Sequence, residues 1–262
     1  MKLNVVPAKQ GLVWVKLGIK TFWRQPLAFT GLFFLFMAWV SLLSMVPVLG
    51  AFMALLILPA ATLGLMVGTE QATAGKFPMP TVLLIAFRAG QQRMKAMLVL
   101  GGLYALSFLA VMALTTLVDG GSFAKVYLAN APITPEVVAS SDFQMAIWLS
   151  TVLYIPMSMM FWHAPALVHW YGVPPVKSMF FSAVACWRNL GAFAVYLLAW
   201  AGVFVAGAAI ILTISSAIGG SDLTAAVLMP GALLMSAMFF SSVYFSVKDC
   251  FDLPSPGSET QA

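Results

Sequence analysis

The chain has 262 residues, of which 62% are hydrophobic and only 8% charged, and its net charge is +5. A soluble domain carries about 25% charged residues, so this much apolar surface cannot be buried in one soluble core and needs lipid as its solvent. The composition leaves no room for a separate soluble domain and predicts a single membrane domain over residues 1–250, followed by a flexible cytoplasmic tail over 251–262. The basic residues lie between hydrophobic segments and form no nucleic-acid patch, so no nucleic-acid partner is expected.

The first predicted elements are an interfacial helix and a pair of membrane spans. Residues 8–24 place apolar side chains on one face and cations on the opposite face, as in a helix that lies flat on a membrane. We expect it to be an entry helix that orients the first span, with surface-lipid binding as the alternative. Pro26 suits the first turn of a following helix. Spans are expected at 27–46 and 51–69, joined as a hairpin by a short uncharged connection.

The middle of the chain repeats this pattern with a longer loop. A polar connection follows the second span, and a second amphipathic run covers residues 81–95. Spans three and four are expected at 96–118 and 143–162, the latter with a possible continuation to residue 170. The loop 119–141 separates them. In the second span, Gly64 and Gly68 have the G-x-x-x-G spacing of close helix contacts, which we expect to serve packing within the chain rather than dimerisation.

The last third begins with a third amphipathic run over residues 176–189. Spans five and six are expected at 190–216 and 223–247, and the small residues of span five predict that it packs centrally against its neighbours. The sequence thus predicts an all-α polytopic membrane protein. It has six transmembrane helices and three interfacial amphipathic helices, arranged as a threefold helix–hairpin repeat. Prolines fall inside the second span of every copy.

Two short segments mark the ends of the first and third amphipathic runs. Trp23-Arg24 and Trp187-Arg188 are each followed by an amide residue and then by a long apolar stretch, and the middle copy has no such Trp-Arg unit. Trp beside a cation at the foot of a span is typical of the membrane–water interface, where the indole lies among headgroups. The residues expected to face anionic lipid headgroups are Lys16, Lys20, Trp23, Arg24, Arg88, Arg93, Lys95, Trp187 and Arg188.

The distribution of cations predicts the orientation. Of the 13 lysines and arginines, all but Lys125 fall on one side of the six predicted spans. The positive-inside rule then places both termini in the cytoplasm.

The predicted spans carry little that suggests chemistry. No Asp, Glu, Lys or Arg lies in the central part of any span, which argues against an ion-coupled pump, a voltage sensor and an intramembrane aspartyl protease. The polar candidates are Glu70, expected in an interfacial ion pair, and His163 and His169, expected in packing or hydrogen bonds. Six positions apart, the two histidines point about 240° apart on one helix, and only a break such as Pro165 would let them share a metal. No catalytic residue, cofactor or metal is expected.

Several segments together resemble a known family. They are Val6-Pro7-Ala8, Arg24-Gln25-Pro26-Leu27, Leu58-Pro59-Ala60 and Lys248-Asp249-Cys250-Phe251. The chain resembles the uncharacterised six-span inner-membrane proteins of proteobacteria. Their repeating layout is similar to the membrane domain attached to some glycerophosphodiester phosphodiesterases. The resemblance implies a multi-pass location in the bacterial inner membrane and supplies no catalytic residue.

The leading hypothesis is a non-catalytic accessory or scaffold protein. Its basic amphipathic helices would engage anionic lipid, or a membrane-protein partner, at the cytoplasmic face. The alternative is a small permease or lipid-handling transporter that is not coupled to ions through intramembrane charges, which predicts a polar cavity open to one side. An enzyme comes third and would need a cleft that joins His163 or His169 to Glu70.

Overall fold

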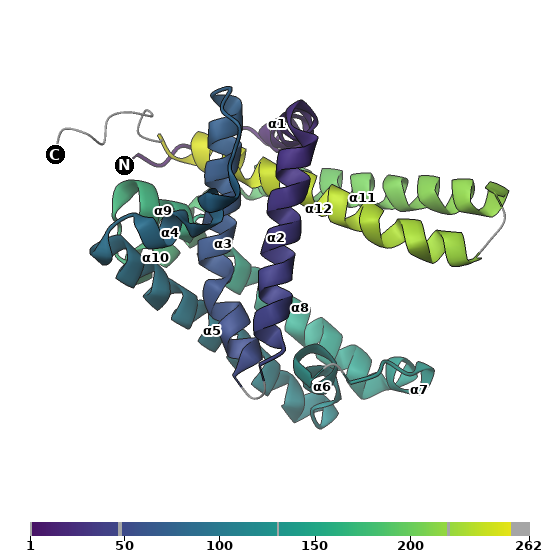
Figure 1. Ribbon diagram of the computed structural model, residues 1–262. Helices are drawn as coiled ribbons and strands as arrows, with labels where there is room; N and C mark the ends of the chain where they lie inside the picture. Colours follow the sequence, from purple (N-terminus) through teal and green to yellow (C-terminus); the bar gives the residue numbers. More distant parts are fainter. Residues whose placement is uncertain (1, 47–48, 130, 219–220, 253–262) are drawn as a thin grey trace.

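The computed structural model describes residues 2–46, 49–129, 131–218 and 221–252, and within these ranges helices form all the regular structure apart from one isolated β-bridge. Six helical segments are long and apolar enough to cross a membrane, which confirms the predicted six-span all-α fold. They are α2 (Pro26–Ser44), α3 (Gly50–Thr73), α5 (Gln91–Asp119), α8 (Ser141–Trp162) with α9 (Ala164–Tyr171), α11 (Leu190–Ile218) and α12 (Ser221–Cys250). They form three hairpins, α2–α3, α5–α8 and α11–α12 (Figure 1).

Each hairpin is preceded by a short interfacial element. These elements are α1 (Gln10–Arg24), the 3-10 helix η1 (Pro80–Leu84) with α4 (Ile85–Arg88), and α10 (Pro175–Arg188). The second differs from the single run predicted over residues 81–95. Gly90, at φ 92°, ends it, and Arg93 and Lys95 belong to the first turns of α5. A positive φ is a conformation that glycine adopts easily, so this residue separates the interfacial element from the span.

The structure is more helical than predicted in two segments, the loop 119–141 and the region after Trp162. The loop 119–141 holds α6 (Ser122–Ala129) and α7 (Pro135–Ala139), and the first turn of α6 is fixed by Asp119, whose carboxylate accepts from the backbone N–H of Phe123. The fourth span does continue beyond Trp162, but His163 interrupts it. Pro165 then lies in the first turn of α9, a position at which proline loses no helical hydrogen bond.

The interfacial elements do not pack mainly on the hairpins that follow them. η1 and α4 lie against α3 of the preceding hairpin, and α10 lies against α8 and α9. α1 packs against α12 and α11 of the third hairpin, at the other end of the sequence. The three copies therefore close in a circle. The ends of the chain meet there, through a β-bridge between Leu3 and Phe251 and a 2.9 Å hydrogen bond from Asn4 N to the carbonyl of Cys250.

The G-x-x-x-G pair of α3 serves one of these contacts. A Cβ added to Gly64 would lie 2.7 Å from Cα of Leu83 in η1, so only glycine lets this interfacial element approach so closely. The partner of the motif is a segment of the same chain, as expected.

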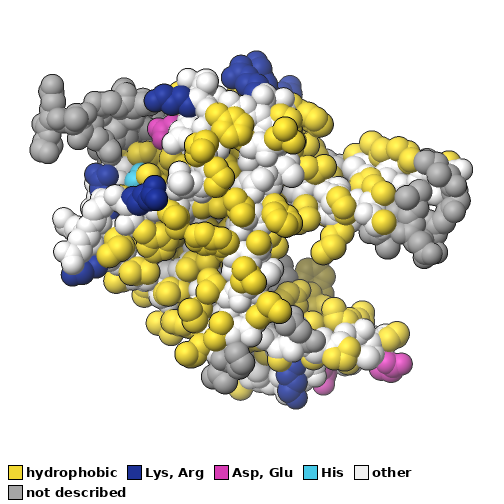
Figure 2. Space-filling model, in the orientation of Figure 1, with side chains coloured by type: hydrophobic (Ala, Val, Ile, Leu, Met, Phe, Trp, Pro, Cys, Tyr) yellow, Lys and Arg dark blue, Asp and Glu magenta, His cyan; other side chains and the backbone are white. Residues whose placement is uncertain are grey.

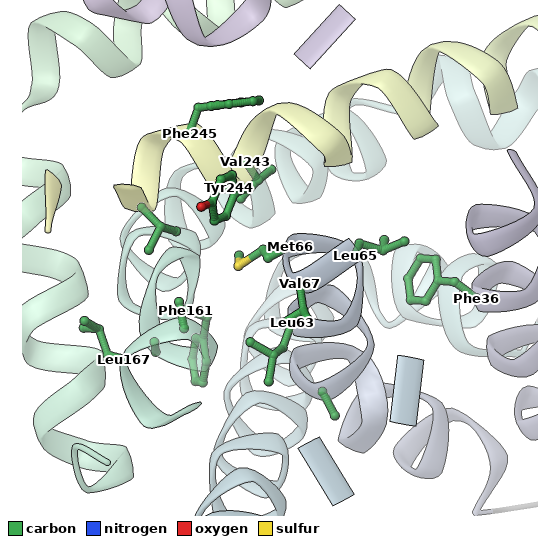
Figure 3. Packing of buried hydrophobic residues seen from close by; sticks show 14 of the residues in the cluster. Phe36, Leu63, Leu65, Met66, Val67, Phe161, Leu167, Val243, Tyr244 and Phe245 are labelled. Atoms are coloured by element: carbon green, nitrogen blue, oxygen red, sulfur yellow. The ribbon is translucent and has the colours of Figure 1, made fainter. Parts of the chain in front are cut away.

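The core lies around α3, and the third hairpin lies largely outside it. Leu63, Met66 and Val67 of α3 pack with Tyr244 of α12 and Phe161 of α8 (Figure 3). In contrast, α11 and α12 project away from the other spans (Figure 1). Only 6% of the α11 span is buried inside the protein, against 56% of α3.

The prediction that span five packs centrally is therefore wrong. Small residues permit close helix contact but do not drive it, because lipid solvates apolar side chains as well as another helix does. Gly202 of α11 illustrates this, since a Cβ added there would meet nothing within 4 Å.

Candidate functional site

The candidate site is the basic ring, defined as α1, η1–α4 and α10 with their lysines and arginines. Each of the three elements ends on an arginine: Arg24, Arg88 and Arg188. Phe87-Arg88 is thus the middle counterpart of the two Trp-Arg units. The sequence analysis looked for Trp-Arg units and did not find this one, because phenylalanine stands in place of tryptophan. The shared signal is an aromatic residue followed by arginine at the end of an amphipathic run.

Seven of the nine side chains predicted to face lipid lie on this ring, and the other two, Arg93 and Lys95, are in the first turns of α5. All of them are exposed except Arg93, which is half-buried. Trp23 and Trp187 are 64% and 69% exposed. Figure 2 shows Lys and Arg groups along the upper and left sides of this face, with an acidic group among them, a broad apolar area beside them, and further acidic groups with a basic group at the lower right. The interaction of these residues with lipid stays a prediction.

The amide after each Trp-Arg unit joins one copy to the next. Gln25 Nε2 donates to the carbonyl of Lys76 at 3.2 Å, in the segment that leads into η1. Asn189 Oδ1 accepts from Val6 N at 2.8 Å, and Asn189 Nδ2 donates to the Asn4 carbonyl at 3.1 Å, in the segment that leads into α1. Both amides therefore bind backbone of the following copy. Tryptophan and arginine face outward while the amide connects the ring.

A carboxylate completes the closure between the first and last copies. Asp249 Oδ2, near the end of α12, accepts from Gln10 Nε2 at 2.6 Å and from Trp14 Nε1 at 2.8 Å. Trp14 is fully buried, with the rings of Phe193 and Tyr196 at centroid distances of 5.3 and 5.9 Å. Buried indole N–H groups usually find a partner, so the aspartate satisfies a donor that would otherwise be stranded.

His163 lies in the interior beneath the ring. It is fully buried at the α8–α9 break, and its Nδ1 lies 3.7 Å from Cys186 Sγ. The rings of Phe193 and Phe251 pack against it at 5.7 and 5.4 Å, and its backbone N–H donates to Ser182 Oγ at 2.9 Å. Burial raises the pKa of the Cys186 thiol, which keeps the sulfur protonated and a poor nucleophile.

The other two polar candidates lie on different helices. His169 is on α9 and packs against Trp170, while Glu70 is near the end of α3 and half-buried. Within the described part of the chain, no group of three His, Cys, Asp or Glu side chains is arranged to hold a metal ion. His163 is thus placed for packing against aromatic rings.

A small cavity lies between α2, α3 and η1–α4. Its volume is about 30 Å³, and its walls include Phe36 and Trp39 of α2, Ala60 and Ala61 of α3, and Phe87 of α4. Phe36 points from α2 toward α3 (Figure 3). The walls are almost wholly apolar, so the cavity is not built to hold a polar solute.

Comparison with known proteins finds a full-length relative. The chain is 40% identical over 261 residues to a probable inner membrane protein of Burkholderia thailandensis, and the alignment covers 98% of this chain and 97% of that protein. No protein-family model matches the chain. No solved structure matches it either.

Proposed function

We propose that this chain, which belongs to the same family as the probable inner membrane protein of Burkholderia thailandensis and is a multi-pass inner-membrane protein, binds anionic phospholipids. The basic ring would bind their headgroups. The protein then has a non-catalytic accessory or scaffold role at the membrane surface. The observation that carries the proposal is that each of the three interfacial elements ends on an exposed arginine.

The electrostatics of such a ring support lipid binding. A lysine or arginine near an anionic membrane surface contributes about 1 kcal/mol of attraction, so several cations together contribute several kcal/mol. The exposed indoles of Trp23 and Trp187 suit the headgroup layer beside them. The absence of charged residues from the middle of the predicted spans supports a role without ion coupling or intramembrane catalysis.

The proposal includes an orientation. All but Lys125 of the 13 cations are on the ring side of the spans, and the positive-inside rule then puts the ring and both termini in the cytoplasm. Alkaline phosphatase fused after Asp252 should be inactive, and the same enzyme inserted in the α6–α7 loop should be active. The reverse result would overturn the orientation.

The accessory role also draws on the similarity of the layout to the membrane domain of some glycerophosphodiester phosphodiesterases. In those proteins a membrane unit accompanies a catalytic domain, and we propose by analogy that this chain accompanies a membrane-protein partner. Partners that co-purify in native-lipid discs would identify it.

The alternative of a small permease has one observation in its favour. Pro59, Pro156 and Pro230 all lie inside the second helix of a hairpin, where missing N–H groups leave backbone carbonyls free to line a path. A permease needs a polar cavity, however, and the cavity between α2, α3 and η1–α4 is apolar.

The test compares lipid retention by two variants. The triple variant Arg24→Gln, Arg88→Gln, Arg188→Gln removes the ring arginines, and Lys125→Gln removes a cation from the other end. Each protein is purified in mild detergent, incubated with phosphatidylglycerol or phosphatidylcholine, and examined by native mass spectrometry. We expect the triple variant to lose the preference for phosphatidylglycerol that the wild type and Lys125→Gln keep. Equal retention of both lipids by the wild type would refute the proposal.

A further inference from the structure

The connection between α5 and α8 forms a folded segment at the end of the second hairpin that lies away from α4 and α10 (Figure 1). It contains α6 and α7, whereas the other two hairpins have only residues 45–49 and 219–220 at this point. We infer that α6 and α7 form a second membrane anchor, which lies in the headgroup layer opposite the ring with its apolar sides in lipid and its charged sides in water. This anchor accepts zwitterionic lipid as readily as anionic lipid, unlike the basic ring.

The length of α5 places this segment at the far headgroup layer. α5 begins beside α4 and has 29 residues, so at 1.5 Å per residue it is about 42 Å long. At the average tilt of spans, about 20°, it covers about 40 Å along the membrane normal. A bilayer with both headgroup layers is about 40–45 Å thick. Asp119, the last residue of α5, therefore lies among the headgroups of the leaflet opposite the ring.

Specific contacts hold α6 against the ends of the two spans. Gly120 and Gly121, at φ 63° and 92°, turn the chain directly after Asp119. The Asp119 carboxylate accepts from the backbone N–H groups of Gly121 at 2.9 Å and of Phe123 at 2.5 Å. Phe123 is buried, and its ring packs against that of Phe143 in α8 at a centroid distance of 5.8 Å. These contacts fix α6 at the depth where α5 ends.

Both short helices have an apolar side and a charged side. Tyr127 of α6 and Val138 of α7 are 62% and 45% exposed. Lys125 and Glu136 precede them by two residues, which is about 200° around a helix, so each charged group points to nearly the opposite side. Hydrogen bonding to its own backbone lowers the pKa of Glu136, so this carboxylate is ionised at neutral pH and belongs in water. A helix with these two sides suits the surface of a membrane.

The neighbouring side chains identify lipid as the cover of the apolar sides. Trp148 is 71% exposed and lies about 10 Å along α8 from Ser141, close to the boundary between headgroups and hydrocarbon where indole rings gather. Residues 117–148 carry three carboxylates and a single lysine, so this end of the protein does not attract anionic headgroups. Figure 2 shows apolar groups beside these charges at the lower right. Insertion therefore rests on apolar contact and needs no lipid charge.

The experiment measures the surroundings of single side chains in a bilayer. Tyr127→Cys and Val138→Cys carry a nitroxide spin label on the apolar sides, and Lys125→Cys and Glu136→Cys carry it on the charged sides. The full chain is reconstituted in vesicles of phosphatidylcholine alone or with added phosphatidylglycerol. Collisions of each label with oxygen, which concentrates in lipid, and with a water-soluble nickel chelate on both sides of the membrane are measured by electron paramagnetic resonance.

Two controls accompany the labelled variants. The native Cys186 and Cys250 are buried, and labelling of the wild type measures any background from them. Thermal unfolding in detergent checks that each variant folds. Ile133→Cys, at another apolar position that is 64% exposed, replaces an apolar-side variant that does not fold.

We expect the ratio of oxygen to nickel-chelate collisions to be several-fold higher at the two apolar-side labels than at the two charged-side labels, in both kinds of vesicle. Equal ratios at all four positions, with free access of the nickel chelate, would place the segment in water and refute the anchor. Shielding of the apolar-side labels from both reagents would mean that protein covers them, which refutes lipid as the occupant. Movement of these labels into water when phosphatidylglycerol is omitted would refute insertion that is independent of lipid charge. None of these outcomes depends on lipid binding by the basic ring.

Discussion

The closure of the ring can be tested at Gly18, where α1 crosses α12. A Cβ added to this residue would lie 2.3 Å from Ser242 Cβ and 2.7 Å from Ser242 Cα, so Gly18→Ala forces the two helices apart. The separation also strains the 3.1 Å hydrogen bond from Ser241 Oγ to the Gly18 carbonyl. Overpacking costs about 1–3 kcal/mol and the hydrogen bond about 1 kcal/mol, whereas replacing a helical glycine by alanine gains about 1 kcal/mol. The free energy of unfolding should fall by about 1–3 kcal/mol.

Gly31 of α2 provides the control. An added Cβ there meets nothing within 4 Å, so Gly31→Ala should show only the gain in helix propensity, up to about 1 kcal/mol. The assay is thermal unfolding in detergent micelles followed by tryptophan fluorescence. At about 2–4 °C per kcal/mol, Gly18→Ala should melt several degrees below Gly31→Ala. Equal melting temperatures would show that α1 does not pack against α12 as closely as the structure places it.

Two further predictions test other contacts of the same fold. Gly101→Ala should destabilise the α3–α5 crossing, because its Cβ would lie 2.0 Å from the Leu56 carbonyl oxygen. Gly102→Ala is the control, since its Cβ would lie 3.9 Å from the Leu56 side chain and should cause no clash. The melting temperatures of the two variants in detergent test this difference. Asp249→Ala should lower the free energy of unfolding by about 1–3 kcal/mol, because the buried indole N–H of Trp14 loses its hydrogen-bond acceptor. Asp249→Asn keeps an acceptor oxygen and should lower the free energy of unfolding by less. Equal denaturation midpoints for the two Asp249 variants would contradict the role of this carboxylate.

The spans were predictable from sequence because lipid imposes a simple requirement on them. Each must be about 20 apolar residues long with its backbone hydrogen bonds formed internally, and both properties are local. The prolines and the junctions after Arg24 and Arg188 are local signals of the same kind. The predicted spans accordingly match the helices within a few residues at their ring ends.

The arrangement of the copies was not predictable, because it depends on contacts between distant residues. Nothing near α1 in the sequence indicates that it packs on α12, more than 200 residues away. The role of Phe87 was hidden because the unit was sought as Trp-Arg. The burial of α11 was misjudged for a related reason, since composition does not distinguish a helix that packs on protein from one that packs on lipid.

The location of the polar contacts explains how the third hairpin, whose α11 packs so little against the other spans, forms one domain with them. Inside a membrane, apolar helices gain little by leaving lipid for each other, so the 6% burial of α11 imposes no large cost. The third hairpin is held instead near the ring, where Asp249 binds Trp14, Asn189 binds the backbone of Val6, and Ser241 Oγ donates to the Gly18 carbonyl at 3.1 Å. Stability concentrated at the ring leaves the far ends of the hairpins in contact with lipid. A protein held together in this way presents its cations in a fixed pattern at one membrane surface, and that fixed pattern is what recognition of a lipid headgroup requires.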